Sequence, residues 1–379
     1  MKKIYKSFAF LIIFSFLFSL FSIFAIAKET ETLSLSARSV CLIEADSKRI
    51  LYGKNENIRM PMASTTKIMT AVVALESGIS LSTEIFVPKE AVNIEGSSLY
   101  LVEGEKITFE SLLYGLLLCS ANDAAIAIAI LVAGSVDGFV TKMNSKASEL
   151  GLSNTHFENP HGLYDDNHYT TAFTLANLMA YCMKNDVFAL ISGCEKKVFP
   201  KGDDGTRMMI NHNKLLRENI GIISGKTGYT KKSGRCLVSC AQKNQLNLIC
   251  VTLNAPDDWN DHKKLYDFGF SNYKKINFDT VSFNIPLISG QKTEITVASE
   301  DISLLVPVDY ENIEMIIESP RFLFAGLKKG DKIGKVVYRY NGKILSSSPL
   351  VLLEDAPKIQ YTFNLFGWLK NLFMKIKEI

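Results

Sequence analysis

Arg59-Met60-Pro61-Met62-Ala63-Ser64-Thr65-Thr66-Lys67-Ile68-Met69-Thr70-Ala71-Val72-Val73-Ala74-Leu75 is the stretch that decides the fold, because its second half is apolar on nearly every side. A helix that is apolar all round is buried inside a protein. The pattern predicts a buried helix that begins near Ser64, after Pro61, and stops at Gly78. Ser64 is therefore expected at a helix N-terminus, with Lys67 on the same helix face.

Ser64 and Lys67 have the spacing of a nucleophile and its base. A backbone N–H at a helix N-terminus points toward a developing oxyanion, and a lysine three residues later reaches the serine hydroxyl. The lysine accepts a proton near neutral pH only if burial or a nearby positive charge disfavours its ammonium form. Lys226 is a candidate for that charge. S-x-x-K alone is a weak signal, since it occurs by chance in most chains of this size.

Two further motifs follow along the chain, Ser120-Ala121-Asn122 and Lys226-Thr227-Gly228. The first interrupts two stretches of helical composition, Phe109 to Leu118 and Ala124 to Val132. The interruption is expected to place polar side chains between two apolar helices.

Each member of these two motifs has an expected role. Ser120 can relay a proton, and Asn122 offers an amide that can hold a substrate backbone. Lys226 and Thr227, on a predicted strand, offer a charge and a hydroxyl group to a carboxylate. Gly228 permits close approach to the strand edge.

The remaining pattern up to Phe270 predicts an α+β domain, assigned to residues 28–275. Helices are expected to gather on an antiparallel sheet that the early hairpin joins. The expected elements are the hairpin over 40–52, helices over 136–150 and 171–183, an ordered loop over 159–167, and strands over 222–227, 236–239 and 246–253.

Two smaller segments complete the predicted organisation. Residues 276–357 carry repeated short β-prone runs and are expected to form an all-β, sandwich-like domain, in which Asn341-Gly342 indicates a type I′ hairpin. Residues 358–379 have an apolar face and an opposite polar face, with interfacial aromatics and lysines. They predict an amphipathic helix that lies in a membrane surface, with docking onto its own domain as the alternative.

The N-terminal segment predicts export. Three lysines precede a charge-free apolar run that closes with Ala25-Ile26-Ala27, so residues 1–27 are interpreted as a signal peptide cleaved after Ala27. An uncleaved anchor is the alternative, since the run is nearly long enough to cross a bilayer. The rest of the chain is expected at the extracytoplasmic face of the cell membrane, held peripherally by the C-terminal helix.

Composition limits the classes of binding partner and the state of the cysteines. The net charge is +3 over 379 residues, with no basic block inside the folded part, which argues against nucleic acid. The seven cysteines include no C-x-x-C pair and lie mostly in apolar runs, so they are expected to be buried thiols. A disulfide from Cys250 to Cys236 or Cys240 remains open in an oxidising compartment.

In this order the three motifs resemble those of the penicillin-binding and serine β-lactamase superfamily. The likeness is closest to low-molecular-weight D-alanyl-D-alanine carboxypeptidases of peptidase family S11, and it covers essentially the whole chain. Further matching segments are Arg59 to Ala63, Gly96 to Ser98, Glu103 to Glu105, Asp123 to Ala125, Asn159 to Leu163, His168 to Ala172 and Asn211 to Asn213.

The resemblance implies a reaction on peptidoglycan stem pentapeptides. Ser64 attacks the carbonyl between two D-alanines, Lys67 takes its proton, and an acyl-enzyme forms with loss of D-alanine before water releases the shortened peptide. The N–H groups of Ser64 and Tyr229 form the oxyanion hole. Ser120, Asn122, Lys226 and Thr227 complete the site. β-Lactams are implied as covalent inhibitors, with no metal or cofactor required.

One departure from the family concerns the substrate carboxylate. Similar enzymes place an arginine after the last central strand, but this chain has Asn254-Ala255-Pro256-Asp257-Asp258-Trp259 there. Arg235 is the nearest substitute, and a solvated surface role is its alternative. Three rival functions also stay open: a β-lactamase, a transpeptidase or endopeptidase with the same acyl-enzyme, and a non-catalytic wall-binding protein.

Overall fold

The computed structural model describes residues 33–201, 205–359 and Gly367. In it, helices pack on an antiparallel sheet and an all-β unit follows, so the α+β prediction is confirmed. The predicted signal peptide and nearly all of the predicted terminal helix lie outside the described residues.

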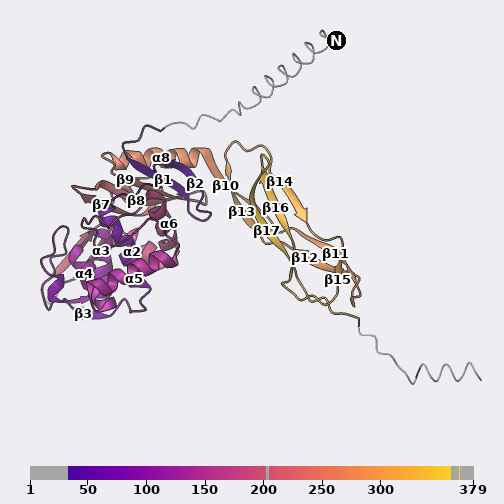
Figure 1. Ribbon diagram of the computed structural model, residues 1–379, viewed down its shortest axis with the longest axis horizontal. Helices are drawn as coiled ribbons and strands as arrows, with labels where there is room; N and C mark the ends of the chain where they lie inside the picture. The colour runs from indigo at the N-terminus through magenta and orange to yellow at the C-terminus, as the bar shows by residue number, and fades with distance from the viewer. Residues whose placement is uncertain (1–32, 202–204, 360–366, 368–379) are drawn as a thin grey trace, which may run out of the picture.

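The central sheet joins the two ends of the first unit (Figure 1). The early hairpin, β1 (Ser39–Glu44) and β2 (Ile50–Lys54), packs beside the meander formed by β7 (Ile222–Thr230), β8 (Gly234–Lys243) and β9 (Leu246–Leu253). The strand order is β2-β1-β9-β8-β7, and all pairs are antiparallel. β7, which carries the Lys226 motif, is therefore an edge strand of this sheet.

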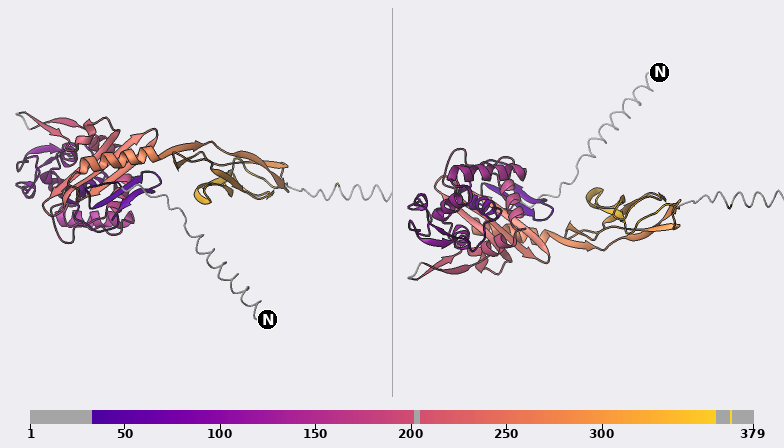
Figure 2. Two further views of the ribbon diagram at one scale, coloured as in Figure 1. Left: turned by 90° about the horizontal axis from the view of Figure 1, so that it is seen from above. Right: turned by 90° about the horizontal axis from the view of Figure 1, so that it is seen from below.

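Helices cover both faces of the sheet (Figures 1 and 2). Helix α8 (Asp258–Asn272) packs on β8 and β9 from one side, and α6 (Ala172–Cys182) packs on β1 and β9 from the other. The side with α6 holds the larger core, in which every apolar residue of α2 from Ile68 to Ala74 is buried. The other helices of this side are α2 (Lys67–Leu75), α3 (Phe109–Leu118), α4 (Asn122–Ala133), α5 (Val136–Glu149) and α7 (Asp186–Ser192).

The seven cysteines are free thiols, as the sequence favoured, and five of them are buried. Cys236 and Cys240 belong to the core beneath α6, whereas Cys250 belongs to the core beneath α8. Because these side chains point to opposite faces of the sheet, a disulfide between them would require the backbone to move.

Several short elements had no clear signal in the sequence. They are the 3₁₀ turns Ala63–Thr66 (η1), Lys89–Ala91 (η2) and Lys214–Arg217 (η3), the strand pair β3 (Glu84–Phe86) and β4 (Lys106–Thr108), and the hairpin β5 (Lys196–Pro200) and β6 (Thr206–Ile210). No single helix among the described residues is long and apolar enough to span a membrane, and α4 with α5 qualifies only as a pair bent by 84°.

The second unit is all-β, as predicted. Its six-stranded sheet has the order β14-β16-β17-β12-β11-β15, and the pair β10–β13 packs against it through Leu304 and Val306 on one side and Val336, Tyr338 and Leu350 on the other. Asn341 and Gly342 both have positive φ between β16 and β17, which confirms the type I′ turn. The strands are β10 (Tyr273–Phe278), β11 (Ser282–Ile288), β12 (Glu294–Ala298), β13 (Ile302–Pro307), β14 (Glu314–Glu318), β15 (Leu323–Phe324), β16 (Lys332–Tyr340) and β17 (Lys343–Leu352).

Candidate active site

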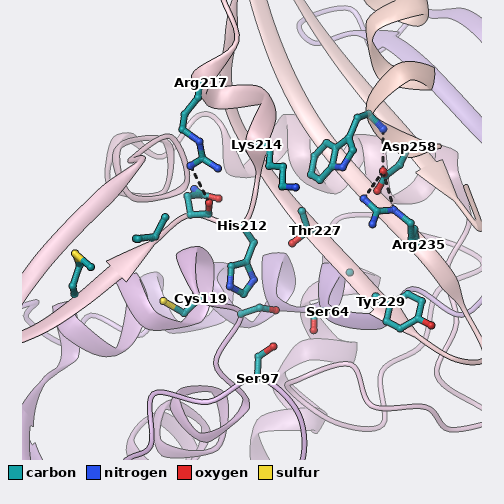
Figure 3. Close-up of a pocket in the computed structure, with 16 residues that line it drawn as sticks. Ser64, Ser97, Cys119, His212, Lys214, Arg217, Thr227, Tyr229, Arg235 and Asp258 are labelled. Atoms are coloured by element: carbon teal, nitrogen blue, oxygen red, sulfur yellow. Dashed lines mark hydrogen bonds and ion pairs between the residues drawn. The ribbon is translucent and has the colours of Figure 1, made fainter. Parts of the chain in front are cut away.

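A cleft of about 700 Å³ opens beside β7 and collects the three motifs (Figure 3). Six of the nine predicted site residues line it: Ser64, Ser120, Thr227, Gly228, Tyr229 and Arg235. The other three, Lys67, Asn122 and Lys226, are buried polar side chains that do not line the open space. The three segments therefore meet in one place, with the serine hydroxyls toward the cleft and both amines behind it.

Ser64 lies on the 3₁₀ turn η1, one turn before α2, and two close contacts hold this turn in place. A Cβ atom on Gly228 would lie 3.0 Å from the backbone nitrogen of Ser64, so only glycine lets β7 pack this closely. A Cβ atom on Gly162 would lie 2.0 Å from the carbonyl oxygen of Ala63. Gly228 thus serves the packing of the strand against the nucleophile, in addition to the predicted access for substrate.

Lys67 is the basic side chain that contacts Ser64. Its side chain is fully buried, and Nζ lies 3.0 Å from Ser64 Oγ, 2.6 Å from Asn122 Oδ1 and 2.6 Å from the carbonyl oxygen of His161. A neutral amine has two N–H donors and one lone pair. In the neutral form of Lys67, the Asn122 and His161 oxygens would accept both N–H groups, and the lone pair would be left for the hydroxyl proton of Ser64.

Electrostatics favour this neutral form. Burial, and then the charge of Lys226, hold the pKa of Lys67 well below its ordinary value, while the Asp123 carboxylate acts in the opposite direction. Burial lowers the pKa of Lys226 to about 7. When Lys226 is protonated, its charge adds to the cost of protonating Lys67.

Most of the hydrogen-bonding capacity of the Asn122 amide is used within the protein. Its Oδ1 accepts from Lys67, and its Nδ2 donates to the carbonyl oxygen of Glu95 at 2.6 Å. One N–H of the amide is left for the predicted contact with a substrate backbone.

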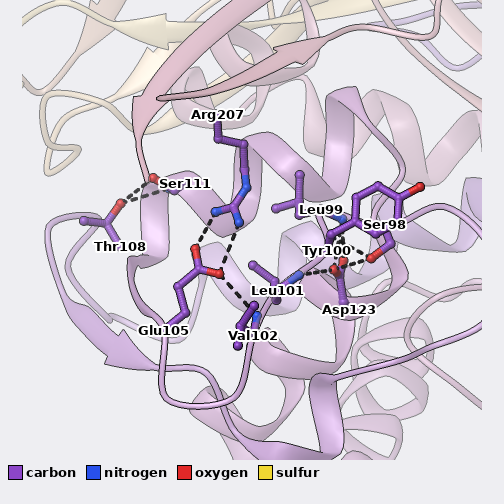
Figure 4. A network of polar contacts seen from close by, with 10 residues as sticks. All are labelled: Ser98, Leu99, Tyr100, Leu101, Val102, Glu105, Thr108, Ser111, Asp123 and Arg207. Carbon is purple, nitrogen blue, oxygen red and sulfur yellow. Dashed lines mark hydrogen bonds and ion pairs between the residues drawn. The ribbon is translucent and has the colours of Figure 1, made fainter. Parts of the chain in front are cut away.

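The next residue, Asp123, was not predicted and anchors the wall of the cleft (Figure 4). Its buried carboxylate accepts hydrogen bonds from the backbone N–H groups of Leu99 and Leu101 and from the hydroxyl group of Ser98. These contacts tie the loop after Gly96 to the start of α4.

Ser120 lines the cleft but makes no hydrogen bond to Lys67 or Lys226 within the described residues. It has a φ of 59°, a left-handed backbone conformation that is uncommon for a residue with a side chain. The predicted proton relay would need the Ser120 hydroxyl to engage when substrate is present.

Arg235 stands at the mouth of the cleft beside Tyr229 (Figure 3). Its guanidinium donates from Nε and from Nη2 to Asp258 Oδ1, at 3.0 and 2.6 Å, and lies over the ring of Trp259. Asp258 is almost fully buried, whereas the Arg235 side chain is 40% exposed. Arg235 is thus held by a carboxylate from the segment 254–259, in which the sequence has no arginine.

A second group of cleft residues carried no recognised role in the sequence. His212, Lys214 and Arg217 lie around η3, on the side of Thr227 away from Tyr229 (Figure 3). Burial and the two site lysines lower the pKa of His212. The sequence pointed to this region only through the family-like segment Asn211-His212-Asn213, which contains His212. The fold shows that part of this segment, together with Lys214 and Arg217, borders the cleft.

His168, which follows the 159–167 loop, has a hydrogen-bond partner at each ring nitrogen. His168 Nε2 lies 2.7 Å from Thr66 Oγ1, one residue before Lys67, and its Nδ1 accepts from the N–H of Glu158. Within the part of the chain that the structure describes, no three His, Cys, Asp or Glu side chains are grouped to hold a metal ion.

Comparison with known proteins identifies the family of this chain. A family model described as D-alanyl-D-alanine carboxypeptidase, peptidase family S11, matches residues 26–257, which is more than half of the chain. The chain belongs to this family. A second model, the C-terminal domain of penicillin-binding protein 5, matches residues 270–358. The family predicted from the three motifs is therefore confirmed.

Individual members of the carboxypeptidase family match over nearly their full length. D-alanyl-D-alanine carboxypeptidase DacF of Bacillus subtilis is 34% identical over 87% of this chain and 88% of its own length. DacA of Escherichia coli is 29% identical over 89% and 88%. The structure of penicillin-binding protein 5 from Haemophilus influenzae superposes with a TM-score of 0.76 at 28% identity, covering 86% of this chain and 99% of that one.

Proposed function

We propose that this chain is a serine D-alanyl-D-alanine carboxypeptidase that removes the terminal D-alanine from peptidoglycan stem pentapeptides. The observation that carries the proposal is the buried Lys67 amine, whose Nζ lies 3.0 Å from Ser64 Oγ. Family membership supports the choice of substrate.

The first half-reaction follows from this contact. Ser64 attacks the penultimate carbonyl carbon as its proton passes to Lys67, and a tetrahedral intermediate forms whose oxyanion faces the N–H groups of Ser64 and Tyr229. The intermediate collapses with cleavage of the peptide bond. Free D-alanine leaves with the proton, and an ester remains on Ser64.

The second half-reaction reverses the roles. Water attacks the ester and gives a proton to Lys67, which returns it to Ser64 as the shortened peptide departs. The terminal carboxylate of the substrate would lie between Thr227, Lys226 and Arg235, where positive charge is concentrated and carboxylate recognition is favourable. A β-lactam would acylate Ser64 by the same attack.

We further propose that the enzyme acts outside the cytoplasm, with residues 1–27 as its signal peptide and residues 358–379 as a peripheral membrane anchor. The apolar run before Ala27 and the two-faced pattern of the C-terminal residues support this location.

Two assays test the catalytic proposal. Purified chain is incubated with a fluorescent penicillin, and released D-alanine is measured with a stem pentapeptide. We expect slow covalent labelling and D-alanine release, both lost in Ser64→Ala and both kept in Ser82→Ala, an exposed serine outside the cleft. Rapid penicillin hydrolysis would indicate a β-lactamase, cleavage of cross-linked peptide alone an endopeptidase, and absence of label a binding protein.

A further inference from the structure

The far end of the all-β unit carries an aromatic patch, formed by Ile288, Phe322, Phe324 and Ile359, which is 40 to 63% exposed at every member. β15 is the edge strand of the six-stranded sheet and pairs in parallel with β11, so that Ile288 stands opposite Phe324. The rings of Phe322 and Phe324 pack edge to face at 5.5 Å. We call this surface the tip patch.

The tip patch is held in place by the core of the all-β unit and by backbone hydrogen bonds. Leu323 and Ala325 alternate with the two phenylalanines and point inward, where both are buried. The backbone is held as well, because the N–H of Ala325 donates to the carbonyl oxygen of Ile288 and the N–H of Ile359 donates to that of Ser289. An exposed phenylalanine on an edge strand, with a second one just before the strand, is a liability for a free protein, so we expect a partner to cover the patch.

Charge and position indicate what the partner is. Arg321 and Lys358 border the patch, and neither forms an ion pair with another described residue. β11 and β15 lie at the end of the second unit away from the central sheet, and the chain reaches Ile359 there before its last 20 residues (Figures 1 and 2). Those residues carry the amphipathic, lysine-containing pattern described above.

We propose that the tip patch is a membrane contact made by the folded all-β unit itself, with an anionic lipid surface as its partner. Phe322 and Phe324 enter the interface between headgroups and acyl chains, while Arg321 and Lys358 lie among the phosphates. The patch and the C-terminal segment then form two adjacent contacts, which orient the unit with its tip toward the bilayer. This inference uses none of the catalytic residues and is independent of the proposed reaction.

The test compares vesicle binding of matched variants in the chain from Lys28 to Ile379. Phe322→Ser with Phe324→Ser is the tip variant, and Phe86→Ser, which removes a 72% exposed phenylalanine from β3, is the control. With vesicles of phosphatidylcholine and phosphatidylglycerol, we expect the tip variant to bind about tenfold or more weakly, since each ring contributes buried apolar area. Circular dichroism and thermal unfolding of both variants check that the fold is intact. Equal binding of tip variant and control would overturn the proposal.

A second measurement separates the lipid from other partners. Phe324→Trp adds a reporter whose fluorescence, in excess of that of the parent chain, should shift to the blue and be quenched by bromine-labelled lipid only when vesicles are added. A blue-shifted reporter before vesicles are added would mean that residues 360–379 cover the patch. A dimer that the tip variant dissociates, seen by light scattering, would mean that a second copy does. Either result would refute the membrane contact.

Discussion

Lys226 should make the native protein less stable than it would be with an apolar residue of similar size, and Lys226→Met tests this. The side chain is 2% exposed, and its Nζ donates a hydrogen bond of 3.0 Å to the carbonyl oxygen of Thr227. Methionine fills a similar volume without a charge. We expect the variant to lose acylation and yet to unfold less readily at neutral pH.

The size of the expected change in the free energy of unfolding follows from the pKa of Lys226. A native value of about 7 against an ordinary 10.5 means that the unfolded chain binds more protons between these pH values, so this group makes the wild type more stable as the pH rises. One pKa unit corresponds to about 1.4 kcal/mol, which gives a penalty of about 4 kcal/mol at pH 7 and about 1 kcal/mol at pH 10. Loss of the hydrogen bond to Thr227 costs about 1 kcal/mol. The net gain of the variant is then about 3 kcal/mol at pH 7 and close to zero at pH 10.

Urea unfolding at both pH values measures the difference in free energy between the variant and the wild type. Lys243→Met, at an exposed position on β8, controls for loss of a positive charge in general and should show little change at either pH. A variant that is destabilised at pH 7, or stabilised equally at pH 7 and pH 10, would show that the reasoning about Lys226 is wrong.

Two further predictions concern contacts at the rim and under the nucleophile. Arg235→Gln leaves the buried Asp258 unpaired beside the substrate carboxylate, so kcat/KM for the pentapeptide should fall roughly 10- to 100-fold, with partial recovery when Asp258→Asn is added. For a C-terminally amidated peptide, which has no terminal carboxylate, the wild type and Arg235→Gln should have similar kcat/KM values. A clear difference would show that Arg235 does not act on the carboxylate. Gly162→Ala places Cβ 2.0 Å from the Ala63 carbonyl oxygen and should cost well over 1 kcal/mol and slow acylation. Gly151→Ala, also at positive φ but with nothing within 4 Å, should show the smaller backbone effect alone, and equal losses would contradict the clash.

Much of the site was predictable because its residues stand in local motifs. Ser64 and Lys67 are one helical turn apart, and the strand character of the Lys226 segment and the meander after it follow from short-range alternation. The early hairpin could be predicted for the same reason. Such features depend on neighbours in the sequence, so a single chain suffices to find them.

The contacts that complete the site come from pairings that no local pattern records. The carbonyl oxygen of His161 reaches Lys67, 94 residues away in the chain, because Gly162 lets its loop pack on Ala63. Asp258 meets Arg235 because α8 begins beside β8, although each residue alone suggests only a charged surface position. The hairpin β5–β6 escaped prediction because its exposed apolar residues, among them Val198 and Met208, do not mark a buried face.

Burial of a titratable group does not by itself make a catalytic site, as His262 shows. It belongs to α8 and is fully buried between this helix and the sheet. Burial lowers its pKa to about 3, and its two ring nitrogens lie 2.7 and 3.0 Å from the hydroxyl oxygens of Ser239 and Thr252. Both ring nitrogens already have hydrogen-bond partners inside the protein, so neither is available to a substrate. We therefore interpret this network as a structural one. Lys67 differs because one of its three partners, Ser64 Oγ, borders the open cleft, and because burial lowers its pKa, which favours the form that could accept the serine proton in the proposed reaction. The chemistry therefore depends on burying the amine while its serine partner stays accessible, which is what the packing of η1 against β7 achieves.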